Sequence, residues 1–203
     1  MTMGSLAQDI VNVCRRLYEK GLIAGADGNV SAMDPVSGNI LITPSGVHKG
    51  FLREADLLTV DLEGHVLAGN GRPSSEFLMH LGIYRADNLA NAVVHTHPPW
   101  AMALSLSGRG FLPHCMIEAK MLLGDIAEVP FYQPGTQALA DAVVAVLKNG
   151  PVQILAHHGA ISRGKTLQQA FELMECLEHN AQIKAISHML GGAMPLPGSQ
   201  KTY

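Results

Sequence analysis

The chain has 203 residues, 47% hydrophobic and 15% charged, which suits one globular domain with a sizeable core over residues 1–203. A formal net charge of -3 without a basic run argues against a general nucleic-acid binder, and neither a signal peptide nor a membrane-spanning apolar stretch is expected. Three widely spaced cysteines form no disulfide framework, so we expect a protein of the reducing cytoplasm.

The amino-terminal half is predicted to combine helices with short strands. Ser5 and Gln8 form a capping box for a first helix, which carries one apolar stripe and ends near Gly21. A second helix is predicted over residues 77–84. Apolar runs bounded by turn residues predict two hairpins of short strands, at 29–33 with 39–43 and at 57–62 with 65–67.

The carboxyl-terminal half starts with a buried apolar strand at 92–94 that runs into two histidines and ends at Pro98. A helix follows, because proline suits the first helical turn. Later elements are a strand at 129–132, a helix at 136–147, strands at 152–158 and 160–162, and a helix from Thr166 to about Met189. Residues from about 191 are expected to form a loose tail. Short hairpin strands mixed with helices favour a largely antiparallel sheet flanked by helices.

His95 and His97 form the pattern most suggestive of chemistry. Alternate side chains of a strand lie on one face, so the two imidazoles supply half of a divalent metal site, although such a pair is as often a polar rim. The third ligand should be His157 or His158, and alternation allows only one of them to face the site. The turn at Gly159 favours His158. His80, His179 and His188 are expected on solvated or half-buried helix faces.

Glu76 is the candidate carboxylate. It begins a predicted helix directly after two hydroxyl residues, where a negative charge is favourable in itself. Near a metal ion, the same carboxylate could act as a general base or as a fourth ligand that substrate displaces.

Three segments have the composition of anion-binding loops. Gly28 and Asn29 lie in a glycine-rich stretch, Thr43 precedes Ser45 and Gly46, and Ser74 and Ser75 lie at a predicted helix start. The hydroxyls are hydrogen-bond donors to an anion, and the glycines let backbone N–H groups approach it closely. Each segment alone is more simply a turn or a cap. Together with a metal triad they indicate a small phosphorylated substrate.

Five motifs in chain order resemble the class II aldolase and adducin head family: Gly28-Asn29-Val30-Ser31, Thr43-Pro44-Ser45-Gly46, Pro73-Ser74-Ser75-Glu76, His95-Thr96-His97-Pro98 and His158-Gly159. The family includes L-fuculose-1-phosphate aldolase, sugar phosphate epimerases, decarboxylases and dehydratases, and the non-catalytic adducin head domain. The resemblance implies a three-layer α/β/α sandwich with a mainly antiparallel central sheet, assembled as a homotetramer with sites between subunits.

By the same resemblance, His95, His97 and His158 would bind Zn²⁺ and Glu76 would be the catalytic acid/base. The residues around the phosphate of a small sugar substrate would be Gly28, Asn29, Thr43, Ser45, Gly46, Ser74 and Ser75. The implied reaction is cleavage of a ketose 1-phosphate, such as fuculose 1-phosphate or a deoxypentulose 1-phosphate, into dihydroxyacetone phosphate and an aldehyde. Decarboxylation, dehydration and epimerisation on the same site are the alternatives, as is an interaction domain.

One departure from the family pattern concerns the segment after the histidine strand. In fuculose-phosphate aldolases a tyrosine there protonates the leaving aldehyde, but residues 114–120 of this chain contain none. Glu118, or less favourably Cys115, is the candidate replacement. Imidazole ligands also suit divalent transition metals other than zinc.

Overall fold

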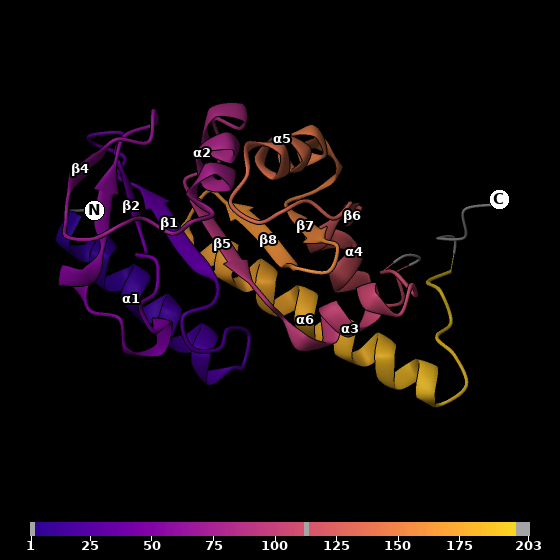
Figure 1. Cartoon of the computed structure of the whole chain (residues 1–203). Coiled ribbons are helices and arrows are strands. Elements are labelled where there is room, and N and C mark those ends of the chain that lie inside the picture. Colours follow the sequence, from indigo (N-terminus) through magenta and orange to yellow (C-terminus); the bar gives the residue numbers. More distant parts are fainter. Residues whose placement is uncertain (1–2, 112–113, 198–203) are drawn as a thin grey trace.

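The computed structural model describes residues 3–111 and 114–197, and of residues 3–5 it describes the backbone only. Its strands form one eight-stranded sheet in the order β4-β3-β2-β1-β5-β8-β7-β6 (Figure 1). The strands are β1 (Asn29–Met33), β2 (Ile40–Ile42), β3 (Leu58–Val60), β4 (Val66–Ala68), β5 (Ala92–Thr96), β6 (Ala127–Val129), β7 (Val152–Leu155) and β8 (Gly159–Gly164). Within the described residues, every pair of neighbouring strands is antiparallel except β6 and β7.

Six α-helices cover the sheet in the described part of the chain: α1 (Met3–Glu19), α2 (Phe77–Ala86), α3 (Pro99–Leu106), α4 (Ile117–Leu123), α5 (Gln137–Ala145) and α6 (Leu167–Met189). Three short 3-10 helices, η1 (Lys49–Phe51), η2 (Glu54–Asp56) and η3 (Leu147–Asn149), lie in the connections. No described helix has the length and apolar character needed to cross a membrane.

The helices form a layer on each face of the sheet, so the predicted three-layer sandwich is confirmed (Figure 1). α1, α3, α4 and α6 share one core with the sheet face that carries Val94 and Ala160. α2 and α5 share the other with the face that carries Val93 and Ile161. Neighbouring residues of β5 and β8 thus enter opposite cores, as strand alternation requires.

The central strand β5 positions the histidines. It pairs with β1 on one side and β8 on the other, and His95 lies opposite Asn29 of β1 and Ile161 of β8. The chain leaves β5 and enters α3, whose first turn is capped by Glu178 of α6, a carboxylate that accepts from the Trp100 and Ala101 N–H groups at 2.9 Å each. His97 therefore lies between a central strand and an anchored helix.

Several predicted boundaries are wrong. α1 begins at Met3, so Ser5 lies inside the helix rather than at its cap. The strand expected at 129–132 is β6, which ends at Val129, and α4 forms where no element was predicted. β7 ends at Leu155, and residues 156–158 form the turn before β8. The predicted strand at 152–158 is too long, because Ala156 continues the apolar run into this turn.

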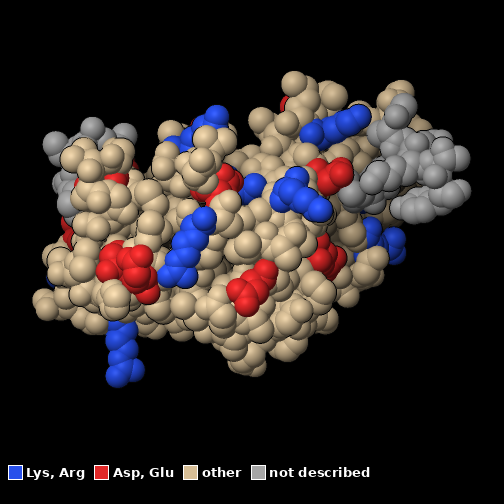
Figure 2. Space-filling model, turned by 90° about the horizontal axis from the view of Figure 1, so that it is seen from above, with Lys and Arg blue, Asp and Glu red and all other residues tan. Residues whose placement is uncertain are grey.

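The charged surface residues and the carboxyl-terminal tail are the remaining features of the fold. Over the face seen in Figure 2, lysine and arginine side chains are interspersed with aspartate and glutamate. Residues 191–197 contain no helix or strand, yet the Leu196 N–H donates to the His114 carbonyl at 3.0 Å, so this part of the expected loose tail is attached. Residues 198–203 lie outside the described part of the chain.

Candidate metal centre

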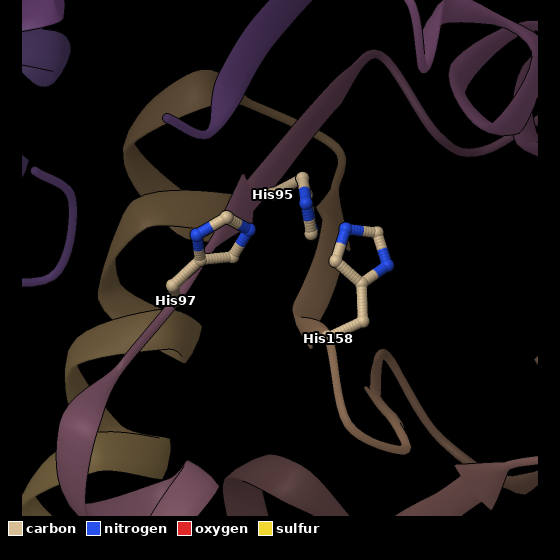
Figure 3. Close-up of side chains that lie close together, drawn as sticks. All are labelled: His95, His97 and His158. Carbon is tan, nitrogen blue, oxygen red and sulfur yellow. The ribbon is translucent and has the colours of Figure 1, made fainter. Parts of the chain in front are cut away.

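Three imidazoles converge at the end of the central strands (Figure 3). His95 comes from β5, His97 from just beyond its end and His158 from the β7–β8 turn. Their ring centroids are 5.1 Å apart for His95 and His97, 4.8 Å for His95 and His158, and 5.5 Å for His97 and His158. One nitrogen from each ring lies within 4.8 Å of the others, a grouping that can hold a divalent metal ion. The predicted triad, including the choice of His158, is thereby brought together.

His157 does not join the triad. Its backbone adopts φ 58°, its side chain is exposed, and its ring lies 6.4 Å from that of Phe131. The alternation argument therefore fails at this point, because both histidines belong to a turn rather than a strand. A left-handed residue at 157 directs the chain so that His158 faces β5.

The donor set fits a divalent metal. Among the described residues, His95 Nε2, His97 Nε2 and His158 Nδ1 are buried and have no hydrogen-bond partner. His95 Nδ1–H donates to the Ala160 carbonyl at 2.9 Å, which selects the tautomer whose Nε2 lone pair is free. Burial and the neighbouring imidazoles lower the pKa of His97 to about 4, so this ring is neutral at pH 7. Neutral imidazoles with free lone pairs are what Zn²⁺ and similar ions bind.

Glu76 faces the triad. Its Oε2 lies 3.1 Å from His95 Nε2, and its Oε1 lies 3.0 Å from His158 Nε2. It is the N-cap residue of α2, but its side chain makes no capping hydrogen bond, so the simple helix-terminal role is not the one observed. Burial raises the pKa of Glu76, and the contacts with His158 and His95 outweigh burial and bring it well below its usual range. An ionised carboxylate beside three imidazoles can accept a proton or bind a metal.

The predicted anion-binding loops adjoin one another. Pro44 and Pro73 form a β-bridge, the Ser45 N–H donates to Arg72 O at 3.0 Å, and the Ser74 N–H donates to Thr43 O at 3.2 Å. Gly28 has φ +68°, and a Cβ there would lie 2.7 Å from Ile23 Cγ2 and 2.8 Å from the His95 carbonyl, so the position requires glycine.

Two of the predicted phosphate residues have structural partners. The buried Thr43 hydroxyl accepts from the Val30 N–H at 3.2 Å, and the Ser74 hydroxyl accepts from the Glu76 N–H at 3.3 Å. Ser45, Gly46 and Ser75 are exposed. The loop thus divides into residues that hold its shape and residues that are open to a ligand.

Lys49 is a buried cation that sequence reasoning missed. Its side chain is fully enclosed, and its Nζ donates to the carbonyls of Ala26, Pro44 and Val47 at 2.9, 3.3 and 2.8 Å. It thus joins the glycine-rich loop to the loop that carries Ser45 and Gly46. Nothing in the local pattern of residues 47–52 distinguishes it from a surface lysine.

Glu118 is not brought to the triad within one chain. It is exposed in the first turn of α4, and its charge acts on Cys176 of α6. His80, expected on a solvated or half-buried face, is fully buried because α2 turns it toward β1. His179 is exposed and His188 half-buried, as expected.

Comparison with known proteins gives consistent matches along the chain. Residues 8–185 match the family described as the class II aldolase and adducin N-terminal domain. An L-fuculose phosphate aldolase of Methanococcus maripaludis is 36% identical over 183 residues, covering 90% of this chain and 97% of the relative. A 3-oxo-tetronate 4-phosphate decarboxylase of Escherichia coli is 34% identical over 187 residues, covering 88% of this chain and 85% of the relative. The solved structure of an L-fuculose 1-phosphate aldolase superposes with a TM-score of 0.89 at 29% identity, covering 98% of this chain and 93% of that one.

Proposed function

The chain belongs to the class II aldolase and adducin N-terminal domain family, and we propose that it is a metal-dependent aldolase that cleaves a ketose 1-phosphate into dihydroxyacetone phosphate and an aldehyde. The observation that carries this proposal is the position of the Glu76 carboxylate, whose oxygens lie 3.1 Å from His95 Nε2 and 3.0 Å from His158 Nε2. Each of the three triad histidines also has a buried ring nitrogen without a hydrogen-bond partner in the described part of the chain. A non-catalytic interaction domain has no need of such an arrangement.

His95, His97 and His158 would hold the metal, which we propose to be Zn²⁺. When bound, a divalent ion supplies a Lewis acid that polarises the carbonyl and hydroxyl oxygens beside the scissile bond. The chain itself contributes rigidity. Two ligands lie on or next to a central strand, and the third precedes β8, which pairs directly with that strand.

Glu76 would move the proton. The bond that breaks, C3–C4 of the sugar, lies next to the C2 carbonyl, so cleavage leaves a three-carbon enediolate that must be protonated at C3. An ionised carboxylate takes the proton from the C4 hydroxyl, which becomes the aldehyde, and the resulting acid can return a proton at C3. General acid–base catalysis by one group contributes roughly 10²–10⁴-fold.

The loops would bind the phosphate. Ser45, Gly46 and Ser75 offer exposed hydroxyl and amide donors, Ser74 lies two residues before the N-cap of α2, and Asn29 adjoins Glu76. Gly28 and Thr43 would maintain the backbone around them. A phosphate held here fixes the distance from the phosphorylated carbon to the carboxylate, so it selects substrates by length.

We further propose a homotetramer with sites between subunits. α4 exposes three large apolar side chains, with Ile117 50%, Met121 77% and Leu122 56% accessible. Such a cluster on one short helix is typical of an interface. Glu118 lies on the same helix, and a neighbouring subunit could deliver it to exchange a proton with the oxygen of the leaving aldehyde.

Decarboxylation is the second candidate function. Loss of carbon dioxide from a 3-oxo-tetronate 4-phosphate also breaks a bond next to a carbonyl and leaves the same three-carbon enediolate. The observation that favours it is the lack of tyrosine in residues 114–120, together with the distance of Glu118 from the triad in one chain. Carbon dioxide leaves without any proton transfer, whereas an aldehyde forms only when the substrate hydroxyl gives up its proton to a nearby group.

The test is phosphorus and proton NMR of a panel of ketose 1-phosphates with metal-loaded protein, with and without chelator. A parallel sample contains 3-oxo-tetronate 4-phosphate labelled with carbon-13 at its carboxyl group. We expect chelator-sensitive dihydroxyacetone phosphate and free aldehyde from the ketose panel. Labelled carbon dioxide, with no cleavage of any ketose phosphate, would replace the aldolase proposal with the decarboxylase.

A further inference from the structure

A continuous line of buried polar groups leads from α2 to the candidate catalytic carboxylate. The Tyr84 hydroxyl lies 2.7 Å from Ser31 Oγ, and Ser31 Oγ lies 2.7 Å from His80 Nδ1. His80 Nε2 is hydrogen-bonded to Asn29 Oδ1, and Asn29 Nδ2 donates to Glu76 Oε2 at 3.2 Å. The five residues are 0 to 7% exposed. In the described part of the chain, the side chain–side chain hydrogen bonds of Tyr84, Ser31 and His80 go to members of this line and not to the triad.

The sequence spacing explains why these groups meet. Glu76, His80 and Tyr84 are four residues apart, so they share one face of α2 and its N-cap. Asn29 and Ser31 are two apart on β1 and therefore point to the same face of the sheet. α2 packs on this face, so the two sets interdigitate.

The direction of every hydrogen bond in this line follows from the carboxylate at its end. An ionised carboxylate only accepts, so Asn29 must present its amide nitrogen to Glu76 and its oxygen to His80. His80 must then carry its proton on Nε2, which leaves Nδ1 as an acceptor. Ser31 donates to Nδ1, and its oxygen accepts from the Tyr84 hydroxyl. The line is thus a one-way series of donors that ends on Glu76.

We propose that His80 is a positioning residue: as the neutral Nε2–H tautomer, it holds the Asn29 amide in the one orientation that keeps the Glu76 carboxylate against His95 and His158. The inference rests on the proposed function only in assigning Glu76 as the acid/base. Without the His80 donor, the buried Asn29 oxygen has no partner, so the amide is no longer held at both ends and can rotate. Its nitrogen then no longer fixes the position of the Glu76 carboxylate.

Ser31 and Tyr84 act one step further away. The Ser31 hydroxyl occupies Nδ1 of His80 and so excludes the other tautomer. Complete burial lowers the pKa of His80 to about 3, so a protonated imidazole does not compete at neutral pH. The Ser31 hydroxyl, two hydrogen bonds away from Asn29, thereby helps to fix the orientation of Glu76.

The kinetic experiment compares His80→Leu, which removes both nitrogens, with His80→Gln, which retains a donor toward Asn29. In the metal-loaded protein we expect His80→Leu to lower kcat for the preferred ketose phosphate by roughly 10- to 100-fold, with KM and metal content little changed. His80→Gln should recover most of the rate. Ser162→Ala is the matched control, because it also removes a buried hydrogen bond, to the Ala170 carbonyl, but lies outside this line. Its kcat should stay within about twofold.

A double-mutant cycle distinguishes positioning from packing. In an Asn29→Ala background, His80→Leu should cause no further loss of kcat, since the group through which it acts is gone. Losses that multiply in the double variant would overturn the inference. If His80→Leu does not fold, Ser31→Ala carries the same test, because it changes one hydroxyl and should still lower kcat severalfold.

Nitrogen-15 NMR of the histidines gives a readout that needs no activity. We expect His80 in the wild-type protein to be the pure Nε2–H tautomer, and to become a mixture in Ser31→Ala and in Asn29→Ala. A pure Nδ1–H tautomer in the wild type would refute the inference whether or not the protein is an aldolase. Conversely, the expected tautomer in a protein that cleaves no ketose phosphate would leave the inference standing and remove the proposed function.

Discussion

Glu76 Oε2 lies 3.1 Å from His95 Nε2, the nitrogen left without a proton when Nδ1–H donates to Ala160. Two acceptors at this distance repel each other unless they share a cation. Among the described residues, the Nε2 of His97 is also without a partner, so the three imidazoles would hold a cation that offsets this repulsion. The contact between Glu76 and His95 thus connects the carboxylate to the metal triad.

His97→Ala should abolish metal binding while leaving assembly intact. His97 follows β5 and its side chain is 30% exposed, so its removal leaves no buried cavity, whereas one of three ligands is lost. We expect metal affinity and turnover to fall by more than about 100-fold, beyond what outer-shell changes cost. Metal analysis and light scattering measure both properties. His179→Ala, an exposed helix histidine, is the control; unchanged turnover in His97→Ala would remove His97 from the site.

Glu76→Gln should retain metal but lose most of kcat. Glutamine has nearly the same shape and leaves the three imidazoles in place, but it neither accepts nor returns a proton. We expect kcat to fall by roughly 10²–10⁴-fold with little change in metal content. A full rate would mean that Glu76 is only a charge at a helix terminus.

Lys49→Met should weaken both the fold and substrate binding. The substitution leaves the carbonyls of Ala26, Pro44 and Val47 without their shared donor, so we expect the free energy of unfolding to fall by roughly 1–3 kcal/mol. KM should rise more than kcat falls, because the two loops candidate for phosphate binding lose their link. Urea denaturation and steady-state kinetics measure these effects. Lys148→Met, at an exposed lysine, should change neither.

Asp87→Asn should destabilise the protein more at neutral pH than in acid. Asp87 accepts from Arg163 Nε at 2.6 Å and from the Leu89 N–H at 3.0 Å. Burial raises the pKa of Asp87, but these hydrogen bonds lower it by more, so the folded pKa lies below the unfolded one. The stabilisation is therefore complete above the unfolded pKa of about 3.9 and is lost as the pH falls through the folded pKa.

For Asp87→Asn we expect a cost of roughly 1–3 kcal/mol at pH 7 that is smaller at pH 3, below the unfolded pKa of about 3.9, by urea denaturation at both pH values. Asp141→Asn, at an exposed carboxylate on α5, is the comparison. A cost for Asp87→Asn that is the same at both pH values would show that the pair with Arg163 contributes nothing through charge.

Met121→Glu should dissociate the proposed tetramer. Met121 is 77% exposed in one chain and lies between Ile117 and Leu122, so an interface over α4 would bury the new charge at a cost of several kcal/mol. Light scattering should show smaller species, with the chain still folded by circular dichroism. Val36→Glu, at an 85% exposed loop residue, should leave the assembly unchanged. An unaltered mass for Met121→Glu would place the interface elsewhere.

The sequence alone determined the features that depend on local periodicity. Strand alternation put His95 and His97 on one face, turn residues separated the strands, and the Thr166 cap began α6, with the Thr166 hydroxyl accepting from the Gln169 N–H at 3.1 Å. The turn at Gly159 and the family resemblance both favoured His158. These predictions succeeded because each depends on a few consecutive residues whose backbone preferences agree.

Only the tertiary structure decided how polar groups from distant segments meet. Local sequence does not show that His80 is buried against β1, that Lys49 joins two loops, or that Glu76 faces His95 rather than solvent. The partners in these contacts include residues 47 and 51 positions apart, Asn29 with Glu76 and with His80. A polar side chain can be buried only where such partners satisfy it, and packing, not the local pattern, supplies them.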